Sequence, residues 1–397
     1  MNWKKTFYAV WLAQVCSITG FSAVLPFLPL FIRELGVTEP SAVARWAGVV
    51  SAAAAVTMGI FGPIWGVLAD RCGRKPMVVR AMWGGTLVLG LMSLSRNVVD
   101  LTLCRLLQGC LTGTVTANVA LVASVAPRER SGYALGMMQA AVFLGHSMGP
   151  LFGGFIADHM GYRPAFLAAA ALLLTGGVVV SLFAHEDFRP APLTENGGRG
   201  SSAEVFAATG FLAAVAALFT IRFANSISNP IFPLFVEQVR GSSERLGTIT
   251  GFILAVGGLA AAVFSGVLGR VSDTWGHRRV LIWCSLFAGI VGGLHVFARN
   301  VLHLVMLRFL FGLGAAGVMP SANAIIRGGT QDRDLGKAYG VTTAATSVGW
   351  MAGPLAGGMV AASLGLRAPF VLMGAALILA AALVSVCVKP PANATRA

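Results

Sequence analysis

The chain has 397 residues, of which 56% are hydrophobic and only 11% are charged, and its mean hydropathy is +0.78. This composition leaves too little polar surface to cover a water-soluble protein of two or three domains. The formal net charge of +14 does not indicate nucleic-acid binding, because the basic residues stand in short breaks between apolar runs and form no stripe with interleaved aromatic residues.

Runs of about 20 apolar residues, the length that crosses a bilayer as a helix, recur along the chain. They predict twelve transmembrane helices, at residues 7–31, 45–66, 77–95, 98–123, 133–156, 164–183, 207–236, 246–268, 280–297, 301–326, 336–361 and 369–388. The first run has no small-residue cleavage site behind it, so we expect it to be retained as a helix. The longest polar segment, residues 185–204, is rich in Gly, Pro and Ser and predicts a cytoplasmic linker between bundles at 1–184 and 205–397.

The basic residues also predict the orientation. If the amino terminus is cytoplasmic, eighteen of the 29 Lys and Arg residues lie on the cytoplasmic side, eight lie outside and three fall within predicted helices. An excess of Lys and Arg marks the cytoplasmic side of a membrane protein. We therefore expect both termini to be cytoplasmic, in a multi-pass protein of the cytoplasmic (inner) membrane.

The two halves of the chain repeat each other. The segment from Gly66 to Lys75, GVLADRCGRK, has a degraded copy from Gly269 to Arg278, GRVSDTWGHR, at an offset of 203 residues. Three further landmarks recur at offsets of 203 or 204: the PFLPLF and PIFPLF motifs of the first and seventh helices, the arginines of the fourth and tenth, and GPLFGG and GPLAGG of the fifth and eleventh. Six helices plus six in parallel repeat place a substrate pathway between the halves near the midplane.

These motifs resemble those of the major facilitator superfamily over essentially the whole chain. GVLADRCGRK is similar to its loop signature between the second and third helices, LCRLLQG at Leu103 to Gly109 to its fourth-helix signature, and GHSMGPLFGG at Gly145 to Gly154 to the fifth-helix signature of drug:proton antiporters. The chain most resembles bacterial twelve-helix antiporters of the tetracycline-efflux and MdtG type. The resemblance implies an all-α polytopic membrane protein, with twelve helices in two pseudo-symmetric six-helix bundles, and proton-coupled efflux.

The repeated loop suggests a gate. Gly73 permits the positive-φ turn that a short helical hairpin needs, and Asp70 is expected near the amino end of the eleventh helix, whose dipole favours a carboxylate. We therefore interpret Asp70 as a latch that closes the cytoplasmic side; the alternative is a topology anchor. Asp273 is the corresponding candidate against the fifth helix. The gating residues are Gly66, Asp70, Arg71, Gly73, Arg74 and Lys75 in the first copy and Asp273, Gly276 and Arg278 in the second.

The fifth helix carries small residues and a proline. Gly145, Gly149, Pro150, Gly153 and Gly154 predict a kinked helix that packs closely against a neighbour. A direct role in antiport and a role in packing alone are both open.

Ionisable residues within the membrane mark function by default, and in this sequence those in the middle of helices are basic. Arg105 resembles the family's fourth-helix arginine that is linked to proton coupling; its alternative role is to bind backbone carbonyls freed by the prolines of the first helix. Arg308, its repeat mate, is expected to be structural. Arg222 lies one helical turn before Asn225 and two before Asn229, so we predict that this face of the seventh helix lines the cavity, with an internal contact as the alternative.

Other polar residues add weaker signals. His146, in the fifth helix, can change protonation near neutral pH, although a lone histidine in an apolar helix is more often a packing residue. Further cavity candidates are Gln14, Ser22, Gln139, Asn118, Asn323, Thr346 and Trp350. The proton could be carried by His146, by Arg105, by boundary acids such as Glu34 and Glu237, or by Asp70.

The sequence contains no nucleotide-binding loop, metal-ligand spacing or nucleophile–base pair, so an enzyme is not expected. Because no carboxylate accompanies Arg222 in the membrane, we expect small amphipathic, anionic or neutral substrates, exported by alternating access of a monomer. The proton gradient is the energy source and no cofactor is expected. The alternatives are a dedicated exporter of an anionic metabolite such as a siderophore, a lipid flippase or, less favoured, an importer; a receptor that does not transport is disfavoured by the short ends.

Overall fold

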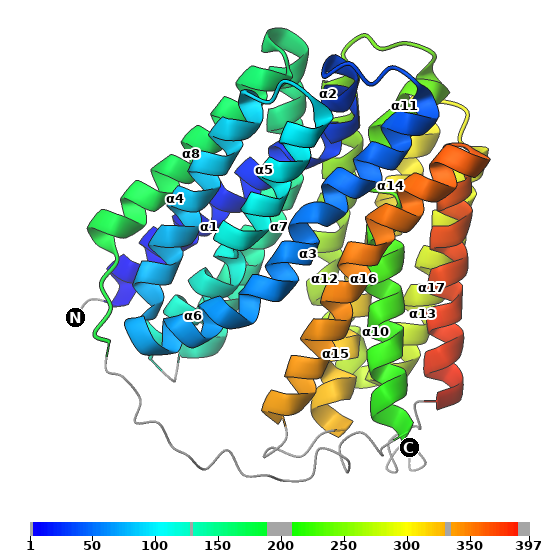
Figure 1. The fold of residues 1–397 in the computed structure, drawn as a ribbon. Coiled ribbons are helices and arrows are strands. Elements are labelled where there is room, and N and C mark those ends of the chain that lie inside the picture. Colours follow the sequence, from blue (N-terminus) through cyan, green and yellow to red (C-terminus); the bar gives the residue numbers. More distant parts are fainter. Residues whose placement is uncertain (1–2, 128–129, 189–208, 330–334, 388–397) are drawn as a thin grey trace.

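The computed structural model describes residues 3–127, 130–188, 209–329 and 335–387, and it is helical almost throughout (Figure 1). Ten helical segments in this part of the chain are long and apolar enough to cross a membrane. The helices α10–α11 and α16 supply the seventh and eleventh helices of the predicted set. The structure therefore has the twelve-helix architecture that the apolar runs predict. Residues 189–204 of the predicted linker lie outside the described residues.

The first bundle contains α1 (Trp3–Val24), the 3-10 turn η1 (Leu25–Phe27), α2 (Leu28–Glu34), α3 (Pro40–Cys72), α4 (Arg74–Ser93), α5 (Val98–Leu111), α6 (Thr114–Val125), α7 (Ser131–Met160) and α8 (Tyr162–Phe183). The second contains α10 (Thr209–Ile227), α11 (Phe232–Arg240), α12 (Leu246–Trp275), α13 (His277–Leu294), η3 (His295–Phe297), α14 (Val301–Ala316), α15 (Val318–Gly329), α16 (Leu335–Leu364) and α17 (Ala368–Cys387).

Several transmembrane helices are longer than their apolar runs or are interrupted. The second extends from Pro40 to Cys72, because its polar ends continue the helix beyond the apolar segment. The first is interrupted at η1, where proline occupies the first turn, and the fourth breaks between α5 and α6 at Gly113, whose φ of +116° suits glycine. Such breaks leave the apolar pattern almost unchanged, so the apolar runs do not reveal them.

The repeat is visible in the backbone as well as in the sequence. Six glycines with positive φ stand in equivalent pairs at the turns between helices: Gly36 and Gly241, Gly73 and Gly276, and Gly161 and Gly365. The turn predicted at Gly73 is present, with φ of +97°, and its copy at Gly276 has φ of +94°. The same tight turns therefore connect equivalent helices in both bundles.

The two bundles meet through α7 against α12 and through α3 against α16. The contact is close on the side where α2 and α11 lie against each other, which we call the closed side (Figure 1). A Cβ atom added to Gly48 of α3 would lie 2.6 Å from the Pro354 carbonyl oxygen of α16, and one added to Gly358 would lie 2.6 Å from the Ala44 carbonyl oxygen. Only glycine permits backbones to approach so closely.

The same helices part on the opposite side, where α1 begins and α17 ends (Figure 1). We call this the open side. An added Cβ would find no atom within 4 Å at Gly59, Gly62 or Gly66 of α3, nor at Gly266 or Gly269 of α12. The buried residues of α3 stop at Ala55. The chain is therefore closed at one face of the membrane and open at the other.

The hydrophobic core follows this division. One cluster joins Phe27 and Phe31 of the first bundle to Phe232 and Phe235 of the second on the closed side, and it continues through the second bundle as far as Val280 and Val384. A smaller cluster around Phe7, Met82 and Met138 belongs to the first bundle alone. Apolar burial thus joins the bundles on the closed side and leaves them independent on the open side.

Candidate functional site

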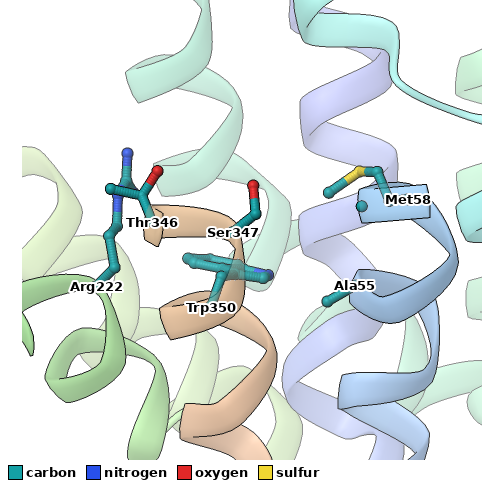
Figure 2. Close-up of a pocket in the computed structure, with 7 residues that line it drawn as sticks. Ala55, Met58, Arg222, Thr346, Ser347 and Trp350 are labelled. Atoms are coloured by element: carbon teal, nitrogen blue, oxygen red, sulfur yellow. The ribbon is translucent and has the colours of Figure 1, made fainter. Parts of the chain in front are cut away.

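A pocket lies between the bundles where they begin to part (Figure 2). It is lined by Ala55, Met58 and Gly59 of α3, Arg222 of α10, and Thr346, Ser347 and Trp350 of α16. The spacing of these residues places each set on one face of its helix. Both bundles contribute, as expected for a pathway between the two halves of a repeat.

Arg222 is the charged group of this pocket. It is half-buried, and no hydrogen bond or ion pair joins it to any residue that the structure describes. Figure 2 shows its side chain beside Thr346. The hydroxyls of Thr346 and Ser347 each donate to a carbonyl one turn earlier in α16, at 2.9 and 2.8 Å, so their lone pairs stay available. The pocket therefore offers a free cation, two hydroxyl acceptors and the face of Trp350.

His146 of α7 is outside the pocket lining and is not in an apolar packing position. Its Nδ1 atom is 2.9 Å from the Ser22 hydroxyl of α1, and its side chain is exposed. A titratable imidazole of the first bundle is thus hydrogen-bonded within that bundle and accessible at its surface.

Other predicted cavity residues are placed elsewhere. Asn118 is fully buried and donates to the Gln14 side chain at 2.5 Å, inside the first bundle. In this conformation it therefore does not line the pocket, and the Asn118 Oδ1 and Gln14 Nε2 atoms are left without a hydrogen-bond partner in the described part of the chain. Asn229 is exposed beyond the end of α10, so the polar face predicted from Arg222 does not continue that far. Asn225 is half-buried, and Gln139 and Asn323 are exposed outside the pocket lining.

Neither of the fourth- and tenth-helix arginines opens on the pocket. Arg105 is 5% exposed and donates to the carbonyl oxygens of Val50 and Ser51 in α3 and to the side chain of Gln108. It binds backbone carbonyls, as its alternative role proposes, but in the second helix and not the first. Arg308 is also buried and lies 3.9 Å from the ring centre of Phe232, a cation–π contact.

The repeated loop is tied to its own bundle. Glu186 accepts hydrogen bonds from the backbone N–H groups of Arg74 and Lys75, at 2.9 and 2.6 Å, and so caps α4. Asp70 and Asp273 are exposed and pair with no residue in the described part of the chain. Neither predicted latch is therefore engaged in this conformation, in which their side is open. Arg71 is exposed as well, and Arg278 donates to the Ser385 carbonyl of α17.

The small residues of α7 lie against two different helices. An added Cβ would meet Ile18 from Gly145 and Ser22 from Gly149, at 2.6 and 2.5 Å, while Gly153 faces Ala23, all on α1. Gly154 instead faces Gly247 of α12, in the opposite bundle. Pro150 lies inside the helix. The motif thus packs α7 on α1 and joins the two bundles at its closed-side end.

Two contacts of the closed side were not foreseen from the sequence. Asp158, at the end of α7, accepts hydrogen bonds from the N–H groups of Gly247 and Thr248 in α12, at 2.9 and 2.6 Å. Arg33 of α2 forms an ion pair of 2.5 Å with Glu237 of α11. Arg33 and Glu237 are 204 residues apart and are therefore repeat mates. Opposite charges at two positions related by the repeat offset are a sequence signal from which this ion pair could have been predicted. Glu34, another predicted proton carrier, lies 3.4 Å from Arg163.

Comparison with known proteins agrees with this geometry. The family model of the Major Facilitator Superfamily matches residues 10–257 and 214–397. The chain belongs to the Major Facilitator Superfamily. Among relatives of this superfamily member, the multi-drug resistance efflux pump PmrA of Streptococcus pneumoniae serotype 4 is 33% identical over 374 residues, covering 93% of this chain and 92% of PmrA. The multidrug resistance protein MdtG of Klebsiella pneumoniae strain 342 is 33% identical over 398 residues, covering 99% and 95%.

Solved structures of superfamily transporters share the fold. A bacterial homolog of the human lysosomal transporter Spinster, in an inward-facing and unoccupied conformation, has a TM-score of 0.81 at 14% identity, covering 97% of both chains. The human organic anion transporter MFSD10 has a TM-score of 0.69 at 19% identity, covering 97% of this chain and all of MFSD10. The superfamily member described here is thus a multi-pass membrane transporter of small molecules and not an enzyme.

Proposed function

We propose that this chain is a proton-coupled multidrug exporter of the cytoplasmic membrane, working as a monomer by alternating access. Two relatives that align over nearly the whole chain are named as multidrug efflux proteins, which supports export of small amphipathic compounds. The observation that carries the substrate class is the free Arg222 in the pocket between the bundles.

An unpaired cation inside a membrane protein is costly, and the electrostatic attraction of an opposite charge is stronger there than in water. A substrate with a negative or electron-rich polar end would therefore gain energy beside Arg222, and a cation would be repelled. The apolar part of such a substrate can lie against Trp350 and Met58, both of which are exposed to the pocket. Amphipathic compounds that are anionic, zwitterionic or neutral fit this arrangement better than cationic drugs.

His146 is our candidate for the proton carrier. Binding sites are coupled reciprocally, so the substrate must disfavour protonation of the carrier for the exchange to run as antiport. A neutral or zwitterionic compound packed beside His146 removes water from the imidazole and disfavours its charged form. An anion that neutralises Arg222 would instead favour a protonated His146, which is the sign of cotransport. Efficient antiport therefore favours neutral and zwitterionic amphipathic substrates.

The second candidate is a dedicated exporter of an anionic metabolite or lipid, which the same free Arg222 supports. In that case the proton would be carried elsewhere, for example by Glu237, Glu34 or Asp70. The two candidates differ in whether strict anions are moved and in whether His146 is required.

The orientation is part of the proposal. The excess of Lys and Arg supports an open side that faces the cytoplasm, with both termini there and the closed side outside. The proposal includes two six-helix bundles, at residues 1–184 and 205–397, joined by a cytoplasmic linker at residues 185–204. The open pocket would then receive substrate from the cytoplasm, as an exporter requires.

The test is flux in proteoliposomes across an imposed pH gradient, with matched cationic, neutral, zwitterionic and anionic forms of one amphipathic scaffold. We expect the neutral and zwitterionic forms to be moved. Arg222→Ala should raise the KM of the zwitterionic form about tenfold or more, the loss of a hydrogen bond to a charged group, whereas the charge-retaining Arg222→Lys should keep most of the activity.

His146→Gln should leave binding intact but remove the dependence on the pH gradient. A wild-type protein that moves no form under the gradient would refute the proton coupling. Preferred transport of the cationic form, or an Arg222→Ala profile like that of the wild type, would refute the substrate class.

A further inference from the structure

The amino end of α12 has no cap of its own. Its N-cap residue, Arg245, makes no side-chain hydrogen bond to the helix and has a left-handed backbone with φ of +49°. The first N–H groups of a helix lack partners within the helix, and here Gly247 and Thr248 donate theirs to the two carboxylate oxygens of Asp158. Because Asp158 belongs to α7, the cap of α12 comes from the opposite bundle.

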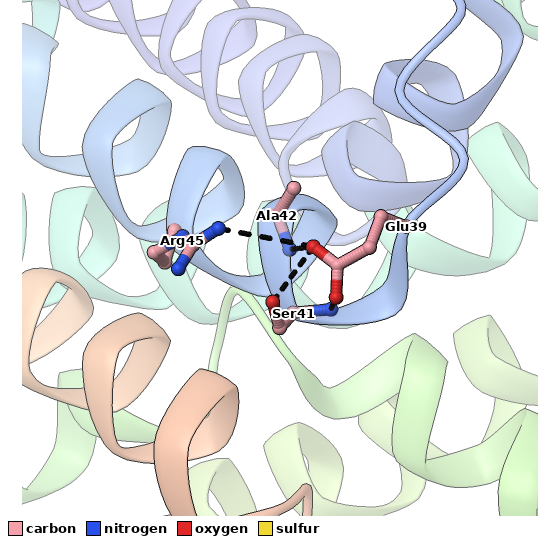
Figure 3. Close-up of polar contacts among 4 residues, drawn as sticks. All are labelled: Glu39, Ser41, Ala42 and Arg45. Carbon is pink, nitrogen blue, oxygen red and sulfur yellow. Dashed lines mark hydrogen bonds and ion pairs between the residues drawn. The ribbon is translucent and has the colours of Figure 1, made fainter.

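Two other described helices are capped by carboxylates, and both caps lie within one bundle. Glu39 precedes α3 and accepts from the N–H groups of Ser41 and Ala42, at 3.0 and 2.7 Å (Figure 3). Glu186 caps α4 from the end of α8. These caps move with their bundle, whereas the contact of Asp158 with α12 must break when the bundles part on the closed side.

Asp158 resembles the predicted latches of the open side in its position. Asp70 and Asp273 are at the ends of α3 and α12, and each is expected to face the first turn of a helix in the other bundle. Asp158 is likewise near the end of a helix, α7, but on the closed side. The offset of 204 residues makes Ala362 of α16 the repeat mate of Asp158. Alanine has no carboxylate, and the helix that packs against α16, α3, is capped by its own Glu39 instead.

We propose that Asp158 is the latch of the closed side: its carboxylate, by capping α12 across the interface, stabilises the conformation with the closed side shut. A carboxylate at a helix amino end is stabilised both by hydrogen bonds and by the helix dipole. The close approach of Gly154 to Gly247 brings Asp158 within reach of these N–H groups. Asp158 therefore acts as a positioning residue that sets the ratio of the two transport conformations.

The experiment measures that ratio without substrate or pH gradient, so it is independent of the proposed function. Spin labels are placed on the exposed Cys72 of α3 and on Thr274→Cys at the end of α12, both on the open side, with the other five cysteines replaced. The distance between them is long when the open side is open. Asp158→Asn should increase the fraction with the short distance at least about five-fold, given the net value of hydrogen bonds to a charged group.

Glu39→Gln is the matched control, since it neutralises a helix cap of similar geometry without crossing the interface. Asp158→Glu retains the charge and should restore much of the wild-type ratio. Thr248→Pro, which removes one donor from the first turn of α12, should shift the ratio in the same direction as Asp158→Asn. An unchanged ratio in Asp158→Asn, or an equal shift in Glu39→Gln, would overturn the proposal.

Discussion

The glycine contacts of the closed side predict that one methyl group can shift the transport cycle. Gly48 of α3 faces the backbone of α16, where an added Cβ would lie 2.6 Å from the Pro354 carbonyl oxygen and 3.2 Å from the Cα atom of Gly358. Both atoms belong to the backbone of a helix and cannot rotate away. Gly48→Ala therefore requires α3 and α16 to separate on the closed side.

The size of the effect follows from these distances. Ordinary contact for a Cβ begins at 3.4 Å, so the helices must separate by about 0.8 Å. Overpacking of a well-packed contact costs about 1–3 kcal/mol, whereas alanine is itself about 1 kcal/mol better than glycine in a helix. Gly48→Ala should therefore leave α3 helical and strain only its contact with α16. A factor of ten in population corresponds to about 1.4 kcal/mol, so the population in which the closed side has opened should rise by about five-fold to a hundred-fold.

Gly59→Ala is the matched control, since Gly59 lies eleven residues further along α3, on the same face, and has no atom within 4 Å of an added Cβ. The assay is the spin-label distance between positions 72 and 274. Gly48→Ala should shorten this distance and lower the transport rate, whereas Gly59→Ala should not shorten it. If Gly48→Ala left both the distance distribution and the rate unchanged, the inference that backbone contact holds the closed side shut would be wrong.

Three further outcomes are expected. Glu237→Arg should open the closed side, because it places two arginines together. The double exchange Arg33→Glu with Glu237→Arg should restore the wild-type spin-label distances between positions 72 and 274. Because the Arg33–Glu237 pair is partly exposed, the population ratio should change by only about two- to five-fold. Arg105→Gln should lower the Tm in detergent, with a loss of about 1–3 kcal/mol for its carbonyl contacts; loss of transport at an unchanged Tm would instead favour a direct coupling role. The Ser41 hydroxyl and the Ala42 N–H hold the pKa of the Glu39 carboxyl below its usual 4.5. The stabilisation by the Glu39 carboxylate is therefore present above pH 4.5 and is lost as the pH falls through the lowered pKa. The Tm difference between the wild type and Glu39→Gln should vanish on acidification, and a difference that persisted would contradict the role of Glu39 as a cap.

Much of the fold could be predicted because the bilayer imposes a simple rule on sequence. A helix that crosses it needs about 20 apolar residues, and these runs located all twelve helices to within a few residues of their apolar parts. The turn at Gly73 was also predictable, since a positive φ in a short hairpin is accessible mainly to glycine. Helix ends and internal breaks were not, because capping groups such as Glu186 come from distant segments.

The site was harder to predict because polarity does not reveal direction. Asn118 and Arg222 are both polar residues within apolar helices, yet Asn118 is buried against Gln14 inside the first bundle while Arg222 lies in the pocket. Helical periodicity placed Asn229 on the face of Arg222, but the helix ends at Ile227. Asp158 gave no signal as an isolated surface acid; its role depends on a helix that starts 88 residues later in the other bundle.

The pairing of Arg33 with Glu237 shows how a duplicated chain makes its own gate. In a parallel repeat the halves are related by an axis along the membrane normal, so residues close to that axis meet their own repeat mates. Identical charges there would repel, and this chain has opposite charges at the equivalent positions. On the open side, Asp70 and Asp273 are free, and we propose that they form the contacts that replace those broken when the closed side opens. An exchange of one set of carboxylate contacts for another would keep the two conformations within a few kcal/mol of each other, so that substrate and proton could shift the balance between them.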